Sequence, residues 1–107
     1  MITVFSLFRK IDSVSTKELL KEVQNNIQLI DVRTSNEYQV GHIKQAKNVP
    51  LQKIESFKGN FGQEIYVICQ SGMRSKQASK ILSKKGYQVK NVRGGMNQWS
   101  GEVRRGR

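Results

Sequence analysis

The sequence predicts one α/β domain with a mostly parallel sheet that helices cover on both faces. Short apolar runs alternate along the chain with stretches that carry apolar residues at helical spacing. Parallel strands need crossover connections, and an alternation of strands and helices supplies them. The length of 107 residues suits one domain with a single core. No internal repeat or low-complexity linker divides the chain.

Two helices of the first half are predicted from the residues that begin them. Ser15 and Glu18 have the spacing of a capping box, in which two side chains satisfy free N–H groups at a helix start. Thr34 and Glu37 repeat this spacing, and the short helix that follows is expected to end at Gly41.

Apolar runs give the strands. The runs 27–32, 46–49 and 65–68 are expected to be buried strands, and a short helix of one or two turns is expected at 51–57. The last strand is expected at 87–92, after the longest helix, and the pair Gly94–Gly95 then turns the chain into a short terminal segment.

The only cysteine, Cys69, lies where the strand 65–68 ends, in a short loop that precedes the longest helix. Such a loop turns backbone N–H groups inward, and the helix start adds partial positive charge. The pattern indicates an anion-binding site around a thiol that ionises easily to the nucleophilic thiolate. Arg74 adds a cation at the end of the loop. The residues expected to bind substrate are Gln70, Ser71, Gly72, Met73, Arg74 and Ser75.

Composition argues against several classes of protein. A single cysteine excludes an internal disulfide and a cysteine-cluster metal site, and it suits a reducing, cytoplasmic setting. The single histidine has no second histidine with which to complete a metal site. We expect no membrane span, because no long apolar stretch occurs, and no signal peptide, because the first residues are apolar and then basic.

The net charge of +11 is unevenly distributed, since residues 65–107 hold ten Lys and Arg against one acid, Glu102. We expect this charge to attract anionic substrates or an acidic partner. Nucleic acid is not expected, because no recognition helix, zinc finger or aromatic RNA-binding pattern accompanies the charge. Residues 104–107 of the basic tail 102–107 are expected to be a mobile terminus. The segment 1–12 is expected to be an added strand or a stretch that packs on the domain 13–101.

Three polar segments are expected to meet at one edge of the sheet, because sites in parallel sheets lie at the carboxyl ends of the strands. They are Asp31-Val32-Arg33, the Cys69 loop, and Arg93-Gly94-Gly95. Their convergence indicates one active site.

With these pieces the chain resembles the single-domain rhodaneses, a family of sulfurtransferases. The matching segments are Asp31-Val32-Arg33, Glu37-Tyr38, Gly41-His42-Ile43, 46–51, 69–75 and Gly94-Gly95-Met96 followed by Trp99. Gln45 departs from the family pattern, which often has glycine there, and this affects only the local turn. The resemblance implies a five-stranded parallel sheet flanked by helices, with Cys69 carrying a persulfide.

The resemblance also implies a reaction and its partners. The Cys69 thiolate takes sulfur from thiosulfate or a persulfide donor such as glutathione persulfide, and passes it to a thiol or to cyanide. A thioredoxin-like protein or a cysteine desulfurase is a candidate protein partner. No cofactor and no metal ion are expected, and a free-standing module of this size is expected to be a monomer.

Two alternatives stay open at this point. A cysteine phosphatase or arsenate reductase would use a similar loop, but phosphate-cleaving loops place five residues between Cys and Arg, whereas four lie between Cys69 and Arg74. Such enzymes also need an acid for the leaving oxygen, and the loop and following helix contain none. The other alternative is a non-catalytic binding module, against which the retained Cys69 argues.

Several polar residues near the predicted site also have structural interpretations. Asp31, Arg33 and Glu37 are expected to form an ion-pair network beneath the site rather than to take part in the chemistry. His42 is expected to brace a turn through local hydrogen bonds. Ser75 is expected to be the N-cap of the longest helix.

Overall fold

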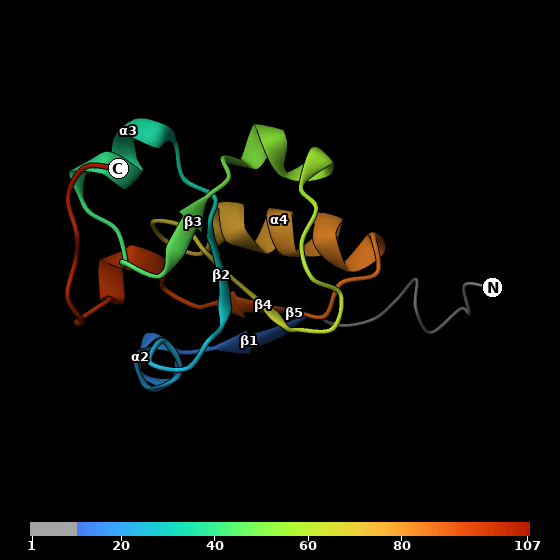
Figure 1. The fold of residues 1–107 in the computed structure, drawn as a ribbon, viewed down its shortest axis with the longest axis horizontal. Coiled ribbons are helices and arrows are strands. Elements are labelled where there is room, and N and C mark those ends of the chain that lie inside the picture. The colour runs from blue at the N-terminus through green and yellow to red at the C-terminus, as the bar shows by residue number, and fades with distance from the viewer. Residues whose placement is uncertain (1–10) are drawn as a thin grey trace.

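The computed structural model describes residues 11–107, in which five parallel strands form one sheet (Figure 1). The strand order is β1-β5-β4-β2-β3. The strands are β1 (Asp12–Val14), β2 (Gln28–Asp31), β3 (Ala46–Asn48), β4 (Ile65–Ile68) and β5 (Val89–Val92). The predicted α/β class and the five-stranded parallel sheet are confirmed.

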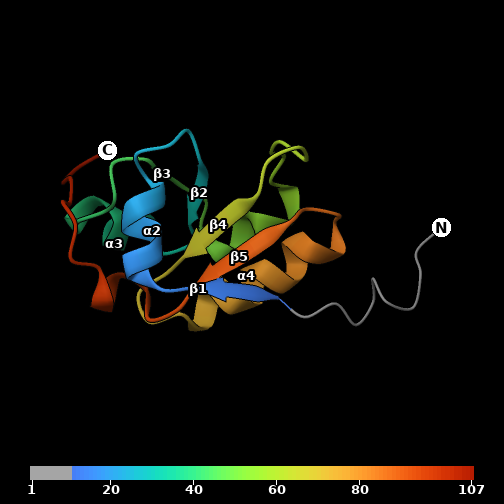
Figure 2. The ribbon, with the colours of Figure 1, turned by 90° about the horizontal axis from the view of Figure 1, so that it is seen from below.

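Helices cover both faces of this sheet (Figures 1 and 2). Helix α4 lies on one side with the 3-10 helix η1, and α2 lies on the other. The helices are α2 (Thr16–Glu22), α3 (Ser35–Val40), α4 (Met73–Lys84), η1 (Leu51–Ser56) and a second 3-10 helix, η2 (Gly95–Gln98). Both predicted capping boxes are present, at Ser15 with Glu18 and at Thr34 with Glu37.

The core consists of two apolar clusters, one on each face of the sheet. The cluster under α4 and η1 contains Val67, Ile54 and Leu82, all fully buried, and it includes Cys69. The cluster under α2 contains Leu19, with Met96 and Trp99 packed against its edge. Burial of such side chains is the main source of stability. Because Cys69 belongs to one cluster and Met96 packs against the other, the site is anchored to both layers.

One of three local expectations is wrong. Residues 12–14 form the strand β1, which pairs with β5 at the sheet edge, whereas an added strand was expected only as one option for the segment 1–12. The short helix expected at 51–57 is confirmed, and it is the 3-10 helix η1. The N-cap of α4 is Gly72 and not Ser75, which lies in the first turn of the helix. The expectation for the segment 1–12 falls mostly outside the described residues.

The basic tail is not a loose terminus. Arg104 pairs with His42 through two backbone hydrogen bonds, of 2.9 and 2.7 Å, and the N–H of Gly106 donates to the carbonyl of Gln39 at 2.8 Å. Figure 1 shows the C-terminus beside α3. The expectation of a mobile tail is therefore wrong, because its backbone has partners on α3 and the turn after it. Within residues 11–107, no helix has the length and apolar character that crossing a membrane requires.

Candidate active site around Cys69

The Cys69 thiol lies at the carboxyl end of the central strand β4, held inside the loop that leads into α4. Its side chain is 1% exposed. The N–H of Gly72 donates to Sγ at 3.0 Å, and the thiol donates to Ser75 Oγ at 3.3 Å. Gly72 has a φ of 105°, a conformation that favours glycine. The turn at Gly72 thus folds the loop back onto the sulfur.

Opposing effects set the pKa of this thiol. Burial raises the pKa of Cys69, because a charge is poorly solvated in the interior. The hydroxyl of Ser75 and the N–H groups of Ser75, Gly72 and Ser71 lower it, because they donate to the thiolate. The hydrogen bonds outweigh burial, and the pKa of Cys69 lies below its ordinary value. The loop therefore favours the anion.

Arg74 forms an ion pair with Glu37 and no hydrogen bond with the Cys69 sulfur. Its two terminal nitrogens donate to the carboxylate oxygens of Glu37 on α3, at 2.7 and 2.9 Å. The Arg74 guanidinium lowers the pKa of Glu37 to about 2, against a partial penalty from burial. Thr34 at the N-cap of α3 holds the same carboxylate. The ion pair thus joins the loop to α3, and the Glu37 carboxylate offsets the positive charge of Arg74.

We expect the hydroxyl of Ser75 to matter more for ionisation of Cys69 than the charge of Arg74. In Ser75→Ala, the pH midpoint of thiol alkylation should rise toward the free-cysteine value of about 8.5, because the thiolate loses a donor. In Arg74→Ala it should stay close to that of the native protein. The measurement is the iodoacetamide rate against pH, and a larger rise in Arg74→Ala than in Ser75→Ala would contradict the assignment.

A buried ion pair between Asp31 and Arg33 supports the loop that holds Cys69. Asp31 and Arg33 are 0% and 3% exposed, and their side chains meet at 2.7 Å. Arg33 also donates to the carbonyl of Gly41 at 2.8 Å and to Gln70 Oε1 at 3.1 Å. The pair therefore connects the end of β2 with the loop that holds Cys69.

The helix η2 closes the other side of the loop, through contacts that the sequence analysis did not assign. The N–H of Met96 donates to the carbonyl of Cys69 at 2.8 Å, and the N–H of Asn97 donates to that of Gln70 at 2.9 Å. A Cβ at Gly95 would lie 2.3 Å from the Cys69 carbonyl oxygen. Only glycine allows this approach, and the Gly94–Gly95 pair was the signal for it.

The side chains of the remaining predicted residues form no hydrogen bond with the sulfur. His42 is buried, stacks on the ring of Tyr38 at 3.6 Å, and has Nδ1 2.7 Å from the Tyr38 carbonyl. Ser71 and Met73 are exposed on the loop surface, Met73 to 75%. Arg93 turns toward β1 and α2, where it donates to Ser13 at 2.8 Å. The predicted convergence at this edge thus holds for Asp31, Arg33 and the glycine turn, but not for the side chain of Arg93.

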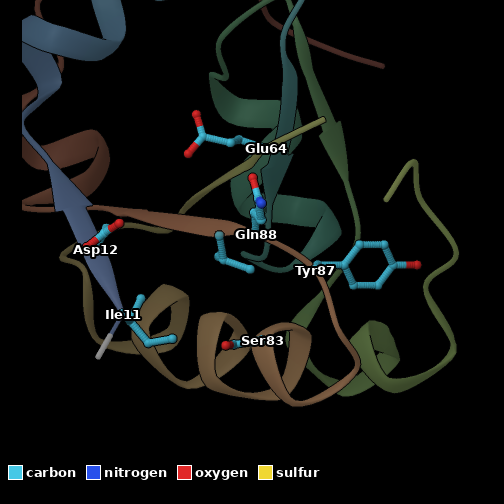
Figure 3. A pocket seen from close by; sticks show the side chains of 7 residues that line it. Ile11, Asp12, Glu64, Ser83, Tyr87 and Gln88 are labelled. Carbon is cyan, nitrogen blue, oxygen red and sulfur yellow. The ribbon is translucent and has the colours of Figure 1, made fainter. Parts of the chain in front are cut away.

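The described residues contain no metal cluster, and a hollow among them lies away from the thiol. Within residues 11–107, no group of three His, Cys, Asp or Glu side chains is arranged to hold a metal ion. A hollow of about 120 Å³ lies beside Asp12, Glu64 and Gln88 (Figure 3). These residues stand at the amino ends of β1, β4 and β5, whereas Cys69 follows the carboxyl end of β4. That hollow is separate from the thiol site.

Comparisons with known proteins agree with this geometry. Residues 15–102 match the profile of the Rhodanese-like domain. The chain is 35% identical to "Putative sulfurtransferase YtwF" of Bacillus subtilis, over 90% of this chain and 94% of that protein. It is 34% identical to "Putative sulfur carrier protein YrkF" of the same organism, of which it spans about half, 53%. Among solved structures, a rhodanese-like domain protein from Staphylococcus aureus superposes with a TM-score of 0.80 at 31% identity, covering 91% of this chain and 100% of that one.

Proposed function

Because the chain belongs to the rhodanese-like domain family, we propose that it is a sulfurtransferase that carries sulfane sulfur as a persulfide on Cys69. The observation that carries the proposal is the pair of hydrogen-bonding groups at Sγ: the N–H of Gly72, which donates to it at 3.0 Å, and the Ser75 hydroxyl at 3.3 Å, which can donate once the thiol has lost its proton. Both groups favour a sulfur anion, and a persulfide is such an anion. Relatives whose names refer to sulfur transfer support the same reaction class.

The proposed reaction has two displacements. The Cys69 thiolate attacks the outer sulfur of thiosulfate, the S–S bond of thiosulfate breaks, and sulfite leaves with the electron pair. This gives Cys69–S–S⁻. An acceptor thiolate or cyanide then attacks the terminal sulfur, and the Cys69 thiolate leaves with the electrons of that bond. The products are the acceptor persulfide or thiocyanate, and the free enzyme is regenerated.

The chain's own residues supply electrostatic stabilisation and positioning. Inward N–H groups of the loop stabilise the anion without reorganising, as the donors of an oxyanion hole do. The carbonyls of Cys69 and Gln70 are held by η2, which keeps the donors aimed at the sulfur. Both terminal nitrogens of Arg74 are engaged by Glu37, so this guanidinium is not free to clamp a phosphate. That arrangement favours sulfur transfer over phosphate hydrolysis.

Donor, acceptor and compartment are part of the proposal. Thiosulfate and glutathione persulfide are the donors of suitable charge, and a thiol of a small molecule or a protein is the acceptor. The relative with sulfur carrier in its name favours a relay between proteins. The free thiol suits a reducing compartment, so the proposed location is the cytoplasm, with no nucleic acid partner and a monomeric state.

Intact mass of the purified protein tests the proposal. After incubation with thiosulfate and removal of excess reagent, the mass should increase by one sulfur atom, and cyanide should return it to the starting value with release of thiocyanate. Aryl phosphate hydrolysis should be negligible in the same preparation. A protein that gains no sulfur from thiosulfate or from glutathione persulfide is not the proposed carrier.

A further inference from the structure

A basic hollow lies at the sheet edge formed by β3. Its volume is about 440 Å³, and it lies between the start of α3 and the helix η1. Its lining contains Lys47, Lys53 and Lys58 and no acidic residue. All three lysines are exposed, and none forms an ion pair with a residue of 11–107. The sequence analysis placed the basic character at residues 65–107, whereas this cluster comes from residues 47–58.

The lining of this hollow, which we name the lysine groove, is partly apolar. It includes Val49 and Pro50, which are half-buried, and Phe57, which is 8% exposed. An apolar lining of this kind favours side chains with methylene or methyl groups, while the exposed lysines favour negative charge. The combination suits an acidic segment of a polypeptide.

The lysine groove is connected to the Cys69 loop. Asn48, in its wall, donates to the carbonyls of Asp31 and Arg33 at 3.0 Å each, and Arg33 reaches Gln70 in the loop. Ser35 lines the groove at the start of α3, the same helix whose Glu37 holds Arg74. Both features therefore belong to the carboxyl edge of the sheet.

We propose that the lysine groove docks a carboxylate-rich segment of the protein that exchanges sulfur with Cys69. This inference rests on the proposed function, of which it names the partner class. Lysines present point charges, whereas phosphate recognition commonly uses the paired donors of arginine. The aromatic ring in the groove is buried, so it offers no face for stacking a base. These features favour carboxylates of a protein over nucleic acid.

Binding of a labelled Glu-rich peptide, followed by fluorescence anisotropy at low and physiological salt, tests the inference. The matched probe has Gln in place of every Glu. The Glu peptide should bind the native protein and the Gln peptide should not. In K47E/K53E, affinity for the Glu peptide should fall by about tenfold or more, since two attractive charges become repulsive. In K17E/K21E, which makes the same charge change on exposed positions of α2, affinity should change by less than about threefold.

Controls keep this test separate from that of sulfur transfer. Transfer from thiosulfate to cyanide should be the same in K47E/K53E as in the native protein. Unchanged transfer also shows that the variant is folded. K47Q/K53Q, which removes the two charges without reversing them, serves as a milder variant. Equal losses in the two charge-reversal variants, no loss in either, or tighter binding of polyuridylate than of the Glu peptide at physiological salt would overturn the inference. Failure of sulfur uptake by Cys69 would instead overturn the proposed function and leave peptide binding unchanged.

Discussion

Cys69→Ser is expected to take up no sulfur from thiosulfate and to lose transfer to cyanide by more than about a thousandfold. The serine hydroxyl has almost no anionic form near neutral pH, so the groups that favour the thiolate of Cys69 have nothing to act on. Cys69 is also the only sulfhydryl of the chain, so no other thiol can replace it. Intact mass after thiosulfate treatment and the rate of thiocyanate formation are the measurements.

The substitution is small enough to leave the fold intact. A serine Oγ at this position lies near the N–H of Gly72 and the hydroxyl of Ser75, both of which are hydrogen-bonding groups. Circular dichroism and the fluorescence of Trp99 should match those of the native protein, and Cys69→Ala provides a second variant. If a folded Cys69→Ser protein still turned over with thiosulfate, the covalent mechanism would be wrong.

Arg33→Ala should reduce the free energy of unfolding by about 3–5 kcal/mol, because it leaves the carboxylate of Asp31 buried without its partner. Asp31 is 0% exposed and receives three contacts from the Arg33 guanidinium, at 2.7 to 3.1 Å. The alanine variant also frees Gln70 from its contact with Arg33, so activity should fall with stability. Urea unfolding followed by circular dichroism measures the change.

Two further variants test whether the unpaired Asp31 carboxylate causes the loss of stability in Arg33→Ala. Replacing both partners, in Asp31→Leu with Arg33→Met, should cost less than Arg33→Ala, since no uncompensated charge is left inside. Arg74→Ala should cost at most about 1 kcal/mol, because the side chains of Arg74 and Glu37 are each 34% exposed and water screens their attraction. A loss below about 1 kcal/mol in Arg33→Ala would show that this buried pair is dispensable.

Local patterns in the sequence predicted those parts of the fold that depend on neighbouring residues. The two capping boxes form as predicted because each needs only residues three apart. The position of Cys69 at the end of β4 followed from an apolar run and a helical pattern on either side of it. The position of strand β1 was not predicted, because one residue of its three, Val14, is buried, which leaves no alternation to detect.

The contacts that were not predicted are of two kinds. Some join segments that are distant in the sequence, and in others a residue takes a role that differs from the one its type most often has at that position. Arg74 and Glu37 meet across two helices, and the lysine groove draws its charges from β3, η1 and the residues after it. Serine is a common N-cap residue, but the hydroxyl of Ser75 lies beside the sulfur. The helix begins at Met73, and its N-cap Gly72 provides no side-chain hydrogen bond. Such choices depend on the tertiary structure, which a local pattern does not contain.

The strand order has a consequence for synthesis on the ribosome. The first described strand, β1, pairs with the last, β5, and β4 gains its second neighbour only when β5 is present. Pairings this distant in sequence close late, after a large loss of chain entropy. The loop around Cys69 also needs Met96 and Asn97 of η2. A nascent chain therefore exposes an unprotected thiol and an unpaired sheet edge until β5 and η2 have left the exit tunnel.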